Sequence, residues 1–127
     1  HAHPDPLQHP QPVTTRTVQD ARQAVANAAG VASVTFTGPG TTYEQIAVDS
    51  MQLAGASTLL PTARLYRGGA SNTGVLMATE LDGNTGAFLG GGISDVLTGS
   101  EQWSIEWTGC TVGALMSAVL TGTYTRN

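Results

Sequence analysis

The chain has no lysine, one cysteine and few charges of either sign. Charged residues make up 11% of its 127 residues, and five arginines face nine acidic residues for a formal net charge of −4. An average globular domain has about 25% charged residues. Proteins that bind nucleic acid need a basic surface that neutralises phosphates. The composition therefore argues against DNA or RNA as a partner.

A single cysteine, Cys110, excludes a framework of disulfides within the chain. We expect it to be a buried small apolar residue. No apolar run approaches the roughly 20 residues that cross a bilayer, and the first residues lack the basic-then-apolar pattern of a signal peptide. We therefore expect a soluble protein that has no membrane partner.

Histidine is absent from the body of the chain, because all three histidines, His1, His3 and His9, lie in the first nine residues. A copper site of the histidine-brace kind needs a second histidine from a folded core, which this chain cannot supply. A serine or cysteine nucleophile would likewise lack its histidine base. These absences predict no nucleophilic catalysis and no metal site.

Acidic pairs give no better signal for catalysis. Glu101 and Glu106 have opposite parity in one predicted strand, so their carboxylates should not converge on a cleft as glycoside hydrolysis requires. Asp82 and Asp95 lie in glycine-rich loops, where aspartate ordinarily caps turns. The Gly90-Gly91-Gly92 run lacks the lysine of a phosphate loop. The sequence predicts a protein that is not an enzyme and uses no cofactor.

The strongest structural signal is the alternation of polar and apolar residues over 99–109. It places Trp103, Ile105 and Trp107 on one face of a predicted strand and polar residues on the other. Since both tryptophans of the chain lie on that face, we expect the strand to lie in the middle of a sandwich core.

Other short alternating segments are separated by turn signals at spacings typical of sandwiches. Residues 17–29 fit a helical or an extended reading, and the following Asn27–Gly30 turn favours a strand that forms a hairpin with 32–37. A second hairpin is expected to join the double-tryptophan strand to 114–124 through 108–113. The further predicted strands are 43–53, 61–67, 74–80 and a short element at 93–97, with a glycine-rich connection over 81–92.

Seven or eight such strands predict an all-β, antiparallel β-sandwich or jelly-roll-like fold. The inward positions of these strands define the predicted core: Val34, Phe36, Ile46, Val48, Leu65, Trp103, Ile105, Trp107, Met116 and Leu120.

The first 16 residues differ in composition from the rest. Four prolines precede Val13, which predicts an extended, polyproline-like arm (1–16) ahead of one sandwich domain (17–127). Such an arm cannot build a core, so it is either a flexible tail or, if ordered, is held by a different chain. The candidate partner contacts are Pro4, Pro6, Leu7, Pro10, Pro12 and Val13 of the arm, together with Tyr66 on the outer face of its strand.

An ordered series of short motifs over about residues 20–125 resembles the small β-sandwich virion proteins of tailed bacteriophages, particularly those with actinobacterial hosts. The motifs are Pro61–Gly68, a glycine-rich variable stretch, Gly99–Trp103, Trp107-Thr108-Gly109, Gly113 and Thr121-Gly122-Thr123. The resemblance implies a non-enzymatic part of a virion.

Of the two locations it leaves open, we favour a capsid decoration protein on the particle surface over a tail component. Such a protein would bind the major capsid protein, or another virion protein, through its arm and a sandwich edge. The low charge of the edges predicts a homo-oligomer.

A carbohydrate-binding or host-attachment module is the alternative, since sandwich lectins hold sugars on exposed rings. Strand parity buries both tryptophans and leaves Tyr66, with Tyr43 as a second candidate, outside.

Overall fold

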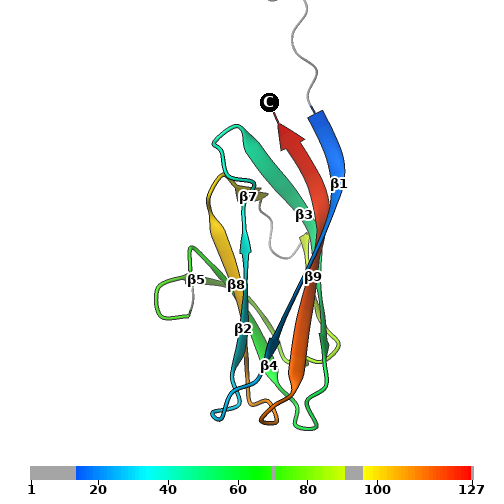
Figure 1. Ribbon diagram of the computed structural model, residues 1–127, viewed down its shortest axis with the longest axis vertical. Helices are drawn as coiled ribbons and strands as arrows, with labels where there is room; N and C mark the ends of the chain where they lie inside the picture. The colour runs from blue at the N-terminus through cyan, green and yellow to red at the C-terminus, as the bar shows by residue number, and fades with distance from the viewer. Residues whose placement is uncertain (1–13, 70, 91–95, 127) are drawn as a thin grey trace, which may run out of the picture.

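The computed structural model describes residues 14–69, 71–90 and 96–126, and these form an antiparallel β-sandwich (Figure 1). The predicted all-β sandwich is confirmed. The first sheet has the order β1 (Thr14–Val25), β9 (Leu115–Arg126), β3 (Glu44–Gly55), β6 (Ala87–Leu89), and β7 (Val96–Thr98) also pairs with β3. The second has the order β2 (Ala32–Thr37), β8 (Gln102–Thr108), β4 (Thr62–Arg67), β5 (Val75–Glu80). The described residues include no helix long and apolar enough to cross a membrane.

The core lies between the two sheets and is built around the double-tryptophan strand. β8 is hydrogen-bonded to β2 on one side and to β4 on the other, and Trp103 and Trp107 are fully buried. Alternation along β2, β4 and β9 sends every second side chain into the same core. All ten side chains of the predicted core are buried there.

Residues 17–29 form a strand over most of their length, as the sequence favoured. β1 begins at Thr14, inside the stretch assigned to the arm, and residues 1–13 lie outside the described residues. Asp20 and Arg22 share the inward parity of β1 with Val18. Their side chains stay partly exposed and form an ion pair of 3.0 Å. A strand at the edge of the wider sheet can place charges on its inner face because water still reaches them.

Both predicted hairpins are wrong. β1 pairs with β9 and β2 pairs with β8, so the turn at Asn27–Gly30 leads from one sheet to the other. The connection 109–114 does the same between β8 and β9. A tight turn can join two strands of one sheet or arch between two sheets, and each of these strands buries one face in either arrangement. Alternation within a strand therefore cannot reveal which sheet it joins.

Two further details differ from the prediction. The described residues contain nine strands, because the connection predicted over 81–92 includes the short strand β6. β3 is longer than the predicted 43–53, and a bulge between Val48 and Ser50 keeps its inner face in register with β9. Of the element predicted at 93–97, β7 begins at Val96, and residues 91–95 lie outside the described residues.

Candidate assembly surface

Three loops at one end of the sandwich are joined by hydrogen bonds into a single platform. In the loop 26–31, the Gly30 carbonyl accepts a hydrogen bond of 3.0 Å from the backbone amide of Cys110, which belongs to the loop 109–114. The loop 56–61 donates the amides of Thr58 and Leu59 to the Thr111 hydroxyl at 2.9 and 3.2 Å. The loop 109–114 thus lies between the other two, and all three are seen at the lower end of Figure 1. A surface built on these loops is already formed before a partner arrives.

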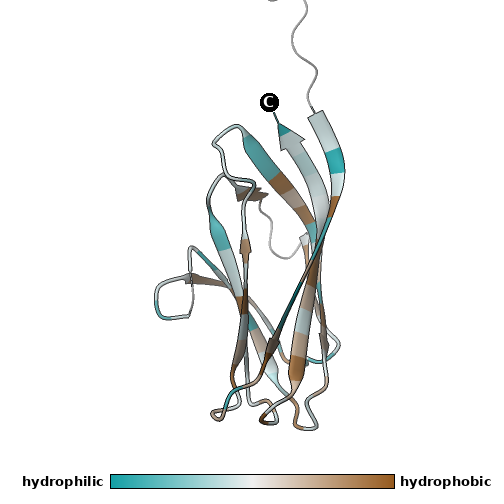
Figure 2. Ribbon diagram, viewed as in Figure 1, coloured by the Kyte–Doolittle hydropathy of each residue, from teal (hydrophilic) through white to brown (hydrophobic). Residues whose placement is uncertain are grey.

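This end carries a concentration of exposed large apolar side chains. Figure 2 shows hydrophobic residues gathered toward it and hydrophilic residues toward the opposite end of the long strands. We call the following set the apolar end, whose members are between 46% and 69% exposed: Val25, Leu59, Leu60, Val112 and Leu115. Exposed apolar side chains that cluster in this way make this end a candidate binding surface, whereas single ones are ordinary.

The three loops themselves lack charge, whereas Asp82 lies in a turn that is hydrogen-bonded to the loop 56–61 through Gly83 and Asn84. The segments 23–43, 50–63 and 107–125, which contain the three loops, have no acidic or basic residue. A partner can therefore cover these three loops without burying a charge that belongs to them, and burial of an unpaired charge is the costly step in many associations.

Sequence reasoning missed the apolar end. The signal that could have found it is the Leu59-Leu60 pair in a turn, where polar residues are usual, together with Val112 between turn residues. Only the fold shows that these two turns and the β1–β9 pair Val25 and Leu115 lie at the same end.

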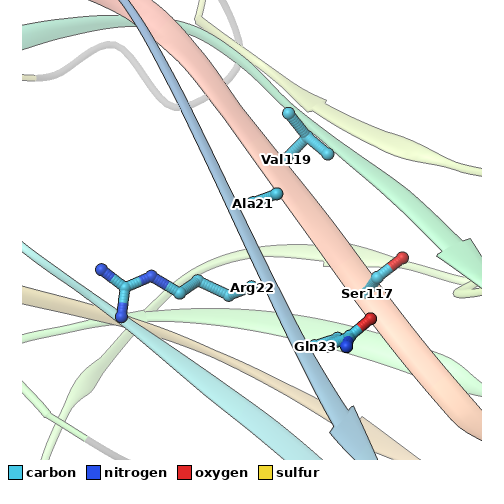
Figure 3. A pocket seen from close by; sticks show the side chains of 5 residues that line it. All are labelled: Ala21, Arg22, Gln23, Ser117 and Val119. Atoms are coloured by element: carbon cyan, nitrogen blue, oxygen red, sulfur yellow. The ribbon is translucent and has the colours of Figure 1, made fainter.

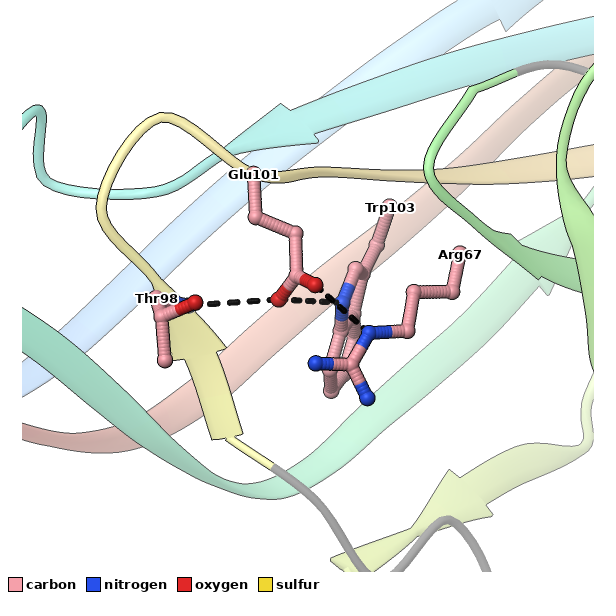
Figure 4. A network of polar contacts seen from close by, with 4 residues as sticks. All are labelled: Arg67, Thr98, Glu101 and Trp103. Carbon is pink, nitrogen blue, oxygen red and sulfur yellow. Dashed lines mark hydrogen bonds and ion pairs between the residues drawn. The ribbon is translucent and has the colours of Figure 1, made fainter.

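Ionisable groups elsewhere are held in structural contacts. In Figure 4 the Glu101 carboxylate lies among Arg67, Thr98 and Trp103. It accepts hydrogen bonds from the Arg67 Nε at 2.5 Å, the Trp103 indole N–H at 3.2 Å and the Thr98 amide at 3.3 Å. This carboxylate satisfies a buried tryptophan, so its role is to fix the core. Glu106 accepts a bond from Ser71 instead, and the two carboxylates do not share a site.

A second polar cluster lies where β3 begins and β9 ends, away from the apolar end. The Tyr124 hydroxyl donates a hydrogen bond to the Glu44 carboxylate, which lowers the pKa of Glu44 and raises that of Tyr124. The Arg16 guanidinium lies 4.1 Å from the centre of the Tyr124 ring. This cluster closes the core at that end.

The remaining sequence candidates have these positions. Tyr66 is half-buried on β4, and Pro4, Pro6, Leu7, Pro10, Pro12 and Val13 lie outside the described residues. Cys110 is buried, as expected, and burial raises the pKa of its thiol. Asp82 caps its own turn by accepting from the Asn84 amide and the Thr85 hydroxyl. Among the described residues no group of three or more His, Cys, Asp or Glu side chains is placed to hold a metal.

No family model and no curated protein matches the chain. Among solved structures it is similar to the Drosophila NLP core, a protein described for pentamer formation and histone binding, with 11% identity over 84% of this chain and 97% of that one and a TM-score of 0.43. It is also similar to the extra small virus particle of the prawn Macrobrachium rosenbergii, with 11% identity over 99% and 88% and a TM-score of 0.33. A third similar structure is a CBM4, with 8% identity over 84% and 94% and a TM-score of 0.32. Remote neighbours thus include a viral particle and a carbohydrate-binding module, and identities this low describe architecture alone.

Proposed function

We propose that this protein is a non-enzymatic structural protein of a bacteriophage particle, a capsid decoration protein on the particle surface. The apolar end is the surface that seats it on the shell. The resemblance of its ordered motifs to virion proteins of tailed phages supports this kind of assembly.

The observation that carries the proposal is the apolar end, whose three hydrogen-bonded loops carry no charge. Each of its five side chains is about half exposed, so covering one stabilises the complex by about 1 kcal/mol. Together they contribute on the order of 5 kcal/mol before the costs of association. Because the platform is preformed, little of this is lost to ordering the loops.

Binding of many copies would stabilise the shell by mass action, since the protein binds the assembled shell and not its separated subunits. Contacts between neighbouring copies add to this. The arm and a sandwich edge, which we expected from the sequence to bind the major capsid protein or another virion protein, are available for them. The major capsid protein is the expected partner of the apolar end.

The test is co-sedimentation of the purified protein with shells of the encoding phage that were prepared without it. Val112→Asp places a charge in the apolar end and should weaken binding at least about tenfold, because the carboxylate would be buried without a partner. Val75→Asp is the matched control, since Val75 on β5 is 71% exposed and Val112 is 63% exposed. The control should bind as the unchanged protein does.

Equal binding by the two variants would refute the apolar end as the shell contact. Absence of the protein from purified particles, measured by mass spectrometry, would refute the virion role altogether.

The carbohydrate-binding alternative has little support from the described rings. Trp103 and Trp107 are fully buried and Tyr66 is half-buried, so Tyr43 is the one ring among the described aromatic residues that is largely exposed, at 69%. Sugar platforms usually use larger, grouped aromatic surfaces. Binding to surface glycans that is lost in Tyr43→Ala and kept in Val112→Asp would favour this alternative.

A further inference from the structure

The prolines of the N-terminal segment follow a strict parity. Pro4, Pro6, Pro10 and Pro12 are all at even positions, and no odd position from 3 to 13 is a proline. In an extended strand, the N–H and C=O groups of alternate residues point to opposite edges. An extended 3–13 segment would therefore have one edge with every amide intact and one edge depleted of donors. Prolines are tolerated in a sheet on such an outward edge.

The strand β1 follows this segment directly. At its free edge, the backbone N–H and C=O groups that point outward belong to odd-numbered residues. The Ala26 amide, one residue beyond β1, donates to the Ala114 carbonyl at 2.8 Å, in register with the β1–β9 ladder. The Leu115 carbonyl instead accepts from Ala56 and so points toward β3. Hydrogen-bonded pairs recur at every second residue of an antiparallel ladder. The even residues of β1 therefore bond to β9, and its odd residues direct their backbone groups away from it.

That odd edge of β1 has no strand beside it in its own sheet among the described residues. It runs over 12 residues with no bulge in its pairing to β9. Long, regular edges of this kind readily pair with an added strand. If the chain stays extended ahead of Thr14, the N–H and C=O groups of the odd-numbered residues from 3 to 25 form an unbroken row along one edge.

We infer that residues 3–13 of one copy add as an antiparallel strand to the free edge of β1 in a second copy, and that the exchange is reciprocal about a two-fold axis near Thr14. The lengths match, since 3–13 and 15–25 each contain six odd residues and each spans about 33 Å when extended. In this register Leu7 lies opposite Ala21 and Val13 opposite Thr15. The prolines then point away from the second copy, toward the side on which β9 lies beside β1. The pairing of β1 with β9 has already ended there, at Thr14 and Arg126.

A depression on the β1–β9 surface supports this register. It has a volume of about 410 Å³ and is lined by Ala21, Arg22, Gln23, Ser117 and Val119 (Figure 3). Ala21 and Val119 are register partners and face outward, so they form an apolar floor for the side chain opposite Ala21. In the proposed pairing this is Leu7, the one large aliphatic residue of the first 12.

Charge also favours a second copy as the occupant. The outward residues of β1 are Thr15, Thr17, Gln19, Ala21, Gln23 and Val25, and the odd residues of 3–13 include only one formal charge, Asp5. The proposed register places Asp5 opposite Gln23. No like charges meet across the added strand, although the protein as a whole is net negative.

The test compares two glutamine-to-proline variants of the full chain by analytical ultracentrifugation. Gln11→Pro removes an odd amide, and hence one inter-copy bond at each of two symmetric sites, and should weaken dimerisation at least about tenfold. Gln8→Pro is the matched control, because position 8 is even and its amide would face outward. It should leave the dimerisation constant unchanged or improve it.

Hydrogen exchange of the odd β1 amides supplies a second measurement. Thr17 and Gln19 should gain protection as the protein concentration rises, and the gain should be lost in Gln11→Pro. A monomeric full chain would overturn the inference, as would equal effects of the two variants or protection that does not depend on concentration. Since these experiments contain no shells, their failure would leave the proposed particle role intact, and failure of shell binding would leave this inference intact.

Discussion

Removing the Glu101 carboxylate should destabilise the sandwich through the tryptophan that it satisfies. In Glu101→Ala the Trp103 indole N–H, on a fully buried residue, loses its acceptor. Leaving one buried donor unpaired costs about 1–3 kcal/mol. The ion pair with Arg67 adds less than about 1 kcal/mol, because its side chains keep 35% and 18% of their exposure. We expect a total loss of about 1–4 kcal/mol.

A loss of this size is a large part of the stability of a small domain, which is about 5–15 kcal/mol. It should lower Tm by on the order of 10 °C. Urea unfolding followed by circular dichroism measures it directly. Glu101→Gln keeps an acceptor oxygen and should lose less than Glu101→Ala.

Glu106→Ala is the matched control for the alanine variant. Glu106 lies on the outer face of β8 and accepts a hydrogen bond from the exposed Ser71, so its loss should stay within about 0.5 kcal/mol. If Glu101→Ala and Glu106→Ala unfold at the same urea concentration, the assignment of Glu101 to the core is wrong.

Two further predictions concern the same core. In Gly83→Ala the new Cβ would lie 2.6 Å from the Trp107 Cδ1 and displace the indole, whose N–H donates to the Gly83 carbonyl at 2.9 Å. We expect the free energy of unfolding, measured in urea, to fall by about 1–3 kcal/mol. An unchanged urea midpoint would contradict this packing. The Tyr124 hydrogen bond lowers the pKa of Glu44 below its ordinary value of 4.5, so its stabilising effect is present above that pH and is lost as pH falls through the lowered pKa. Tyr124→Phe should therefore flatten the acid limb of the stability curve, and parallel curves for the two proteins would argue against the contact.

The sequence predicted the features that depend on local alternation. The face of β8 that carries Trp103 and Trp107 is buried as expected, and so is the face of β9 that carries Met116 and Leu120. In a strand without a bulge, residues of opposite parity lie on opposite faces. The bulge in β3 breaks this alternation, since Val48 and Met51 are both buried. The strand character and inner face of the strongly alternating segments could therefore be deduced without the fold, whereas the short strand β6 could not.

Features that depend on distant segments could not be deduced in this way. The partners of β1 and β2 lie in different sheets, although a turn of a few residues joins the two strands. The apolar end is assembled from Val25, the Leu59-Leu60 pair, Val112 and Leu115, which no local pattern relates. Loop positions acquire a shared surface only when the strands that carry them are arranged in space.

The most direct test of the proposed role is a cryo-electron microscopy map of the particle that encodes this chain. We expect density for the sandwich on the outside of the shell, with Leu59, Leu60 and Val112 buried against the capsid protein. A map in which the protein is absent, or in which these side chains face solvent while another surface meets the shell, would contradict the account.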